Sequence, residues 1–203
     1  PRLCGSRYTG KPEEEKVELF NNVIYNYGSD GAYAGEGGSY NFLANYYKPG
    51  PFTATKGSYK RLFTAYADDG KNKNAAGTHG VFYFNDNYVD PSCPKLSDKQ
   101  KADIYKIQRD NSYGLIIKKD FAPEKELLAE KPFDIAEHTS LQSARKAYKS
   151  VLDYAGASLK RDVIDARIVE ETRKGNYTHE GSHGSTNGMI DRPTDVGGRP
   201  AYK

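Results

Sequence analysis

Two arginines near the start of the chain, Arg2 and Arg7, have the side chains best suited to bind an anionic ligand. A guanidinium group presents a planar fork of N–H donors that matches a carboxylate and holds it through two hydrogen bonds. We therefore identify both residues as candidates for a cleft that binds carboxylates. A salt bridge at the surface or between neighbouring turns of the chain is the alternative, and the sequence leaves both interpretations open.

A second candidate group consists of two adjacent tyrosines, Tyr46 and Tyr47, flanked by Lys48 and Lys56. A tyrosine ring offers a flat apolar face to a sugar ring, and a lysine supplies a positive charge for an anionic sugar. These four residues are our candidates for substrate contacts. Core packing for the tyrosines and simple solvation for the lysines are the competing interpretations.

Residues that could hold a metal ion form no convincing group in the sequence. His179 and His183 have the i, i+4 spacing of two metal ligands on a helix, but they stand in a Gly- and Ser-rich loop. Asp191 and Asp195 stand in a similar loop, where they could bind calcium or shape turns through capping, and the turn-forming role is favoured. We therefore predict no metal site made by this chain.

The composition argues against several classes of protein. The net charge is only +3, and no run of basic residues resembles a nucleic-acid-binding tail, so we expect no nucleic-acid partner. No apolar run approaches the ~18 residues of a membrane helix, so we expect no membrane span. Seventeen Tyr against no Trp suit half-exposed sheets as well as sugar-facing surfaces. Cys4 and Cys93 are too few for a disulfide scaffold, and whether they pair stays open.

Short apolar runs that end in Tyr recur in the first half of the chain. Their terminal residues are Tyr27, Tyr46, Tyr66 and Tyr88, which are 19, 20 and 22 residues apart. A repeat of this length, built from short strands, predicts a solenoid with one coil per repeat and one shared core. Asn residues at the bends would then stack and share hydrogen bonds. An antiparallel β-sandwich is the alternative.

Residues 95–203 change character from strands to helices. Apolar residues recur there at helical spacing, and Ser residues suited to N-caps precede each run. The helices are expected near 97–111, 141–154 and 159–174, with Ser97, Ser140 and Ser158 at their starts. The run Leu115-Ile116-Ile117 is expected to form one more short strand.

The domain organisation follows from this change of character. Residues 1–139 are expected to form coils with a helical insertion near 97–111. Residues 140–203 are expected to form a helical extension and loop tail of the same domain. Helices of this kind cannot line the interior of a solenoid, so we expect them to pack on its outside or to cap its end.

The start, the middle and the tail of the chain resemble one known family. The start Pro1-Arg2-Leu3-Cys4, followed by Phe20-Asn21-Asn22-Val23, looks like the segment of pectate lyases in which an Arg-x-Pro-Arg stretch precedes a hydrophobic-Asn-Asn strand. The run 37–51 is similar to the next coil of that family. The tail 154–198 looks like the C-terminal extension of secreted bacterial pectate lyase-like proteins. The resemblance spans nearly the whole chain.

The resemblance implies a mainly β fold, a right-handed parallel β-helix followed by C-terminal α-helices. It also implies β-elimination on an acidic polysaccharide such as pectate or pectin, with calcium, by a secreted, periplasmic or cell-surface protein that is a monomer at full length. A cation on the uronate carboxylate eases loss of the neighbouring C5 proton, and arginines act beside that proton. In this scheme Arg2 and Arg7 are the candidate catalytic residues.

The sequence departs from the family pattern at its start. The family's catalytic Arg stands two residues before the Pro, a position that would precede Pro1. The second Arg of the pattern falls on Cys4, and Arg7 is a candidate to compensate for it. The calcium-binding acids of the family lie on earlier coils. We therefore expect this chain to be the C-terminal part of a lyase, to be inactive by itself, and to depend on upstream residues for any calcium.

Two further functions stay open at this point. A non-catalytic carbohydrate-binding β-helix is the main alternative, and Cys4 in place of the expected Arg favours it. A glycoside hydrolase on the same fold would need paired acids facing a cleft, and the sequence shows no convincing pair.

Overall fold

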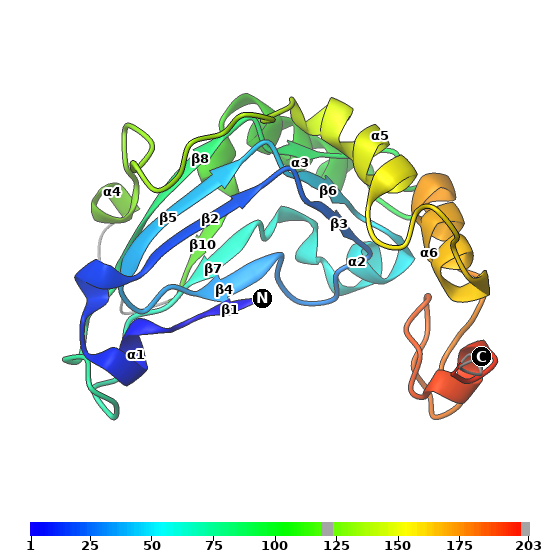
Figure 1. The fold of residues 1–203 in the computed structure, drawn as a ribbon, viewed down its shortest axis with the longest axis horizontal. Helices are drawn as coiled ribbons and strands as arrows, with labels where there is room; N and C mark the ends of the chain where they lie inside the picture. The colour runs from blue at the N-terminus through cyan, green and yellow to red at the C-terminus, as the bar shows by residue number, and fades with distance from the viewer. Residues whose placement is uncertain (119–123, 200–203) are drawn as a thin grey trace.

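The strands form three sheets in which every described pair is parallel (Figure 1). The computed structural model describes residues 1–118 and 124–199. Sheet A contains β1 (Arg2–Leu3), β4 (Ala32–Ala34), β7 (Phe63–Ala65) and β10 (Leu115–Ile117). Sheet B contains β2 (Lys16–Phe20), β5 (Gly38–Leu43) and β8 (Gly80–Asn85). Sheet C contains β3 (Val23–Tyr25), β6 (Tyr46–Lys48) and β9 (Tyr88–Val89).

Each pass of the chain adds one strand to each sheet in turn. The order β1-β2-β3 is repeated as β4-β5-β6 and as β7-β8-β9, and β10 begins a fourth pass. Successive passes therefore stack edge to edge, which is consistent with the expected parallel β-helix. The antiparallel sandwich is not found among the described strands.

The stacking period differs from the predicted one. In sheet B, Lys16 pairs with Ser39 and Ser39 with Val81, so the steps are 23 and 42 residues. Tyr46 and Tyr88 do pair with each other in sheet C, but Tyr66 follows β7 in sheet A. The prediction of one coil per 20 to 22 residues was wrong because one pass contains three strands, and insertions lengthen some passes more than others.

Helices occupy more of the described chain than strands do, so the fold is mixed rather than mainly β. They are α1 (Ser6–Thr9), α2 (Pro51–Lys56), α3 (Asp98–Arg109), α4 (Glu124–Leu127), α5 (Ala144–Tyr154) and α6 (Val163–Lys174). Short 3-10 turns cover Pro12–Glu14, Ser58–Lys60, Asn111–Gly114 and Pro193–Val196. In the part of the chain described, no helix is long and apolar enough to cross a membrane.

The predicted helices are present, but two of them begin later than expected. α3 begins after Ser97, whose side chain accepts from the Gln100 N–H, as predicted. α5 begins only after Ser143, because the Gln142 backbone is bonded to the Asn21 side chain through both its N–H and its carbonyl. α6 begins after Asp162, whose carboxylate caps the first turn in place of Ser158.

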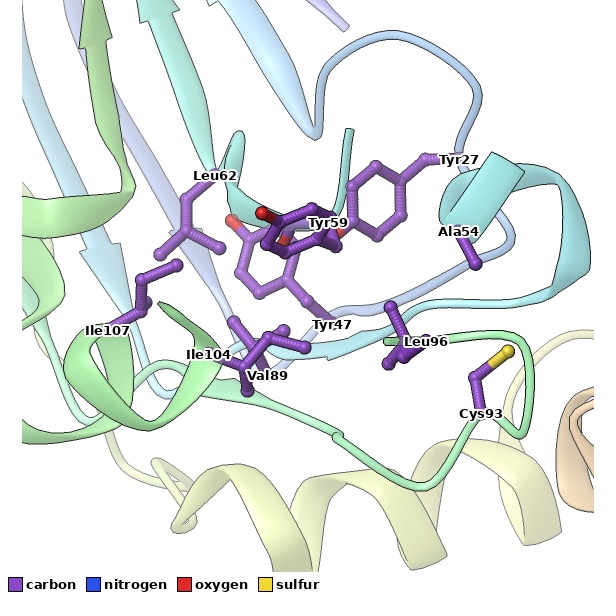
Figure 2. Packing of buried hydrophobic residues seen from close by; sticks show 10 residues of the cluster. All are labelled: Tyr27, Tyr47, Ala54, Tyr59, Leu62, Val89, Cys93, Leu96, Ile104 and Ile107. Carbon is purple, nitrogen blue, oxygen red and sulfur yellow. The ribbon is translucent and has the colours of Figure 1, made fainter. Parts of the chain in front are cut away.

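The core between the sheets is built from aromatic rings stacked from one pass to the next. In β5 the residues Tyr40 and Phe42 are fully buried, and Tyr40 stacks on Phe82 of the next pass at 5.0 Å. A second cluster lies against α3, where Ile104 and Ile107 pack near Val89 (Figure 2). This helix covers the edge of β9, since the Gln108 side chain donates to the Val89 carbonyl at 2.6 Å.

Four asparagines form a hydrogen-bonded ladder across the passes. Asn22, Asn45 and Asn87 lie at the bend between sheets B and C, and Asn111 lies in the 3-10 turn before β10. The side chain of Asn22 donates to Asn45 (2.9 Å), Asn45 donates to Asn87 (2.9 Å), and Asn87 donates to Asn111 (3.1 Å). Each acceptor oxygen also receives the backbone N–H of the preceding Asn. The predicted sharing of hydrogen bonds by Asn at a bend is therefore confirmed.

We expect Asn45→Ala to lower the free energy of unfolding by about 2–4 kcal/mol, because it leaves buried donors and acceptors on both neighbouring passes without partners. Asn85→Ala, at an exposed position two residues before Asn87, is the matched control and should change it by less than about 0.5 kcal/mol. Urea unfolding measures both. Equal effects of the two changes would show that the ladder stabilises the fold no more than an exposed asparagine does.

Candidate functional site

Arg2 lies on β1, the edge strand of sheet A, and its side chain points away from the core. Its neighbour Leu3 packs against the core cluster, so the alternation of the strand directs Arg2 outwards. The side chain is 42% exposed, its Cζ lies 5.9 Å from the centre of the Tyr33 ring, and its Nη2 lies 3.4 Å from Glu36 Oε1. Among the described residues, Glu36 accepts through one of the five N–H donors of the guanidinium, and the other four are left for other acceptors.

Arg7 lies on α1 and is enclosed by acids from the next two passes. Its Nε is 3.5 Å from both Glu36 Oε2 and Asp68 Oδ2, and its Nη2 is 3.7 Å from Asp69 Oδ1. The side chain is only 16% exposed. The structure therefore brings the two predicted arginines together on Glu36, but it leaves only Arg2 open to a ligand.

The sequence analysis did not identify Glu36 and Asp68, the buried acids of this cluster, which are 5% and 2% exposed. Glu36 stands in a tight turn, in which Gly37 has φ 128° and a side chain there would meet Pro12 at 2.6 Å. The Glu36 carbonyl accepts from Ser6 of the previous pass and from Asn74 of the next. A lone acid among glycines, in the run Gly35-Glu36-Gly37-Gly38, was the signal that the sequence offered.

Burial raises the pKa of the Glu36 carboxyl above its ordinary value of 4.5, against the lowering effect of the nearby Arg7 and Arg2. A carboxyl with a raised pKa binds protons more tightly in the folded state than in the unfolded state. The stability that this binding contributes is present at low pH and is lost as the pH rises through the raised pKa.

We therefore expect wild-type protein to lose stability relative to Glu36→Gln as the pH rises from about 4.5 to neutrality. Glutamine keeps the shape of the side chain and carries no charge that burial can penalise. Urea unfolding of both proteins at a series of pH values gives the difference directly. A difference that grows in favour of the wild type with rising pH would contradict the assignment.

Three of the four predicted substrate-binding residues are buried on β6 of sheet C, with Tyr46 and Lys48 beneath α5 and Tyr47 on the opposite, core-facing side. Tyr46 stacks on Tyr148 at 4.2 Å, and Tyr47 is 2% exposed and belongs to the core near α3 (Figure 2). Lys48 Nζ lies 3.5 Å from Asp90 Oδ2 and donates to the Tyr148 hydroxyl at 3.1 Å. Tyr46 and Lys48 therefore connect the C-terminal helices to the sheet.

Lys56, the fourth predicted residue, lies at the end of α2 and is exposed. Its Nζ lies 5.4 Å from the centre of the Phe52 ring, which belongs to the same helix. Sheet C and α2 carry these four residues, whereas Arg2 is on sheet A. The predicted contacts thus fall into two separate groups, and the substrate-binding role of the second group stays a prediction.

The pair of Lys48 and Asp90 is buried, so each charge depends on the other. Burial tends to raise the pKa of Asp90, but hydrogen bonds from Ser92 and Tyr46 and the charge of Lys48 outweigh it, and the pKa is lowered. Removing one partner of a buried pair costs far more than removing both, because an uncompensated charge remains.

We expect Lys48→Met to lower the free energy of unfolding by about 3 kcal/mol, and Asp90→Asn added to it to recover at least half of that loss. Lys149→Met, at an exposed lysine of α5, is the control. Thermal and urea unfolding measure the three proteins. If the double variant is no more stable than Lys48→Met, the two charges do not stabilise each other.

The described residues hold no group of three His, Cys, Asp or Glu side chains that could bind a metal ion. Asp195 accepts the backbone N–H groups of Ser182, Asp191 and Arg192, which is a turn-capping role. Calcium implied by the resemblance therefore does not fit a site made by the described residues. Cys4 and Cys93 are both free thiols.

Curated proteins with similar sequences are named as probable pectate lyases. "Probable pectate lyase C" of Aspergillus flavus is 28% identical over 198 residues, covering 94% of this chain and 38% of that protein. Proteins of the same name from Aspergillus fumigatus and Emericella nidulans are 28% and 25% identical, again over 94% of the chain and over 38% and 37% of their own lengths. No family model matches the chain.

These distant relatives support a pectate lyase-like family. The chain spans less than two fifths of the length of the curated relatives it matches. The relatives come from fungi, while the predicted likeness of the tail to bacterial proteins stays a prediction.

Proposed function

We propose that this chain forms the C-terminal part of a secreted polysaccharide lyase that cleaves polygalacturonate or pectin by β-elimination. The observation that carries the proposal is Arg2, a half-exposed guanidinium on the outer side of a parallel sheet, with most of its donors open. The distant relatives named probable pectate lyase C agree with this assignment. The sheets would then be the last passes of a right-handed parallel β-helix, the hand that such connections strongly favour.

The chemistry assigned to Arg2 is stabilisation of negative charge. In β-elimination a base removes the C5 proton of a uronate, and the electrons of the C–H bond form the C4–C5 double bond. The bond from C4 to the glycosidic oxygen breaks, and that oxygen leaves and takes up a proton. Charge develops on the C6 carboxylate as the C5 proton departs, and a guanidinium on that carboxylate lowers the barrier.

The base and any calcium would be supplied by passes of the chain that precede Pro1. The described residues do not form a calcium site, so no step is assigned to a metal held here. Arg7 is enclosed by Glu36 and Asp68 and is a poor replacement for the arginine that the family pattern expects at Cys4. The isolated chain is therefore proposed to bind substrate without cleaving it.

A non-catalytic carbohydrate-binding protein is the second candidate. Cys4 favours it, because a thiol stands where the family pattern has an arginine. The enclosure of Arg7 favours it too, since one expected cation is neutralised by acids of the next passes. The two candidates differ in turnover and share the binding of an acidic polysaccharide.

A longer protein that carries this chain together with its preceding passes tests the choice. With polygalacturonate and calcium, we expect ultraviolet absorbance to rise as unsaturated uronate ends form. Arg2→Ala should lower kcat/KM about 100-fold, the usual cost of losing one donor to a developing oxyanion. Arg109→Ala, at the exposed end of α3, is the matched control.

A folded longer protein that produces no unsaturated ends from any uronate polymer would exclude the lyase and leave the binding protein. Full activity of Arg2→Ala would instead exclude the role assigned to this arginine.

A further inference from the structure

The outer side of sheet B carries polar side chains that the proposed lyase chemistry does not use. Phe42 of β5 faces the core, so its neighbours Asn41 and Leu43 alternate to the outer side. The parallel register sets Glu18, Asn41 and Tyr83 in one row across the passes and Phe20, Leu43 and Asn85 in the next row. Arg2 belongs to sheet A and takes no part in these rows.

The segment 128–143, between α4 and α5, crosses this outer side (Figure 1). Asn41, which is fully buried, accepts from the Phe133 N–H at 3.0 Å and donates to the Phe133 carbonyl at 2.8 Å. Asn21 holds the Gln142 backbone in the same two-point way. The crossing segment is thus fixed at two places, and it encloses a cavity of about 420 Å³ against the sheet. Small-molecule sites have volumes of about 300–1,000 Å³.

His138 of the crossing segment forms part of the cavity wall and is held in one orientation. Its Nε2 lies 2.6 Å from Glu18 Oε2, and its ring centre is 4.6 Å from that of Phe20. At this distance from a carboxylate the nitrogen carries the proton, because two lone pairs would repel each other. In the neutral ring Nδ1 is then left as an acceptor. Glu18 is itself fixed, since its other oxygen accepts from Asn41 at 2.6 Å.

Three further polar side chains line the cavity, namely Tyr83, Asn85 and Asp134. None of the three side chains is hydrogen-bonded to another residue of the part of the chain that the structure describes. Asn85 and Asp134 are exposed and Tyr83 is half-buried, so a ligand can reach all of them. Leu43 and Phe133 add apolar surface beside these groups. The cavity therefore combines an apolar wall with a few free polar groups, as small-molecule sites do.

The charges of the cavity disfavour an acidic sugar. Glu18 and Asp134 are acids, and the described residues that line the cavity include no lysine or arginine. The carboxylate of a uronate would therefore meet like charge there. An ammonium ligand can only donate, so it would leave the Asn85 amide N–H groups and the Tyr83 O–H without acceptors. A sugar hydroxyl both donates and accepts, and so it suits this mixture of groups.

We propose that this cavity on sheet B binds a neutral pyranose sugar. Asp134 and His138 Nδ1 accept hydrogen bonds from its hydroxyls, and Asn85 and Tyr83 both donate and accept. The Phe133 ring packs against the apolar C–H face of the sugar. This site goes beyond the proposed lyase, because it lies on another sheet, takes an uncharged ligand and requires no turnover.

A pair of matched probes tests the site on the 203-residue chain by NMR titration. Methyl β-galactoside and the corresponding glycoside of galacturonate differ only at C6, which is a hydroxymethyl group in one and a carboxylate in the other. At neutral pH we expect the galactoside to bind at least tenfold more tightly. Asp134→Asn should reduce this preference at least threefold, because it removes a charge that repels the uronate.

Variants of the wall locate the binding. Asp134→Ala and Tyr83→Phe should each weaken galactoside binding at least fivefold, because each removes a group that bonds to a hydroxyl. Glu137→Ala is the matched control, since Glu137 is an exposed acid of the same segment that does not line the cavity, and it should bind as the wild type does. Unfolding temperatures equal to that of the wild type show that the variants are folded.

Three results would overturn the site. Equal binding of the two glycosides would remove the preference for a neutral sugar. Galactoside binding that both Asp134→Ala and Tyr83→Phe leave unchanged would place the sugar elsewhere on the molecule. Binding of tetramethylammonium, with no binding of the methyl glycosides of galactose, glucose or xylose, would show that the acids serve a cation instead.

Discussion

The fold depends on the exact superposition of one pass of the chain on the next, and buried amides maintain it. Asn45 is fully buried, yet its side chain bonds to Asn22 in one pass and to Asn87 in the other. A buried amide without partners is costly, so each of these residues requires its neighbours to stay in register. The residue before each of these three takes a positive φ, which bends the chain from sheet B into sheet C.

The same superposition places charged groups of different passes together. Arg7 belongs to the first pass, Glu36 to the second and Asp68 to the third, and their contacts exist only while the passes are aligned. The acids of the cluster neutralise Arg7, whereas Arg2 contacts only Glu36 among them, through Nη2. Arg2 remains on the outer side of sheet A, in line with Tyr33. A shift of register by one residue would turn these side chains towards the core.

The sequence predicted the kind of element well and the arrangement of elements less well. The Ser97 cap and the strand at Leu115–Ile117 were predictable because local hydrogen bonding and β-branched residues determine them. The number of residues per pass was not predictable, because insertions between strands change the spacing while the strands themselves stay similar. Arg2 and Arg7 could be identified from residue type, but the neutralisation of Arg7 depends on acids more than 25 positions away, a relation that spacing does not reveal.

The central claim is that an acidic sugar chain binds at Arg2, on the outer side of sheet A. A crystal structure of the chain with a bound oligogalacturonate tests it most directly. The account predicts a sugar chain with one carboxylate on the Arg2 guanidinium. A ligand bound on sheet C or among the C-terminal loops, with Arg2 contacting only Glu36, would contradict it.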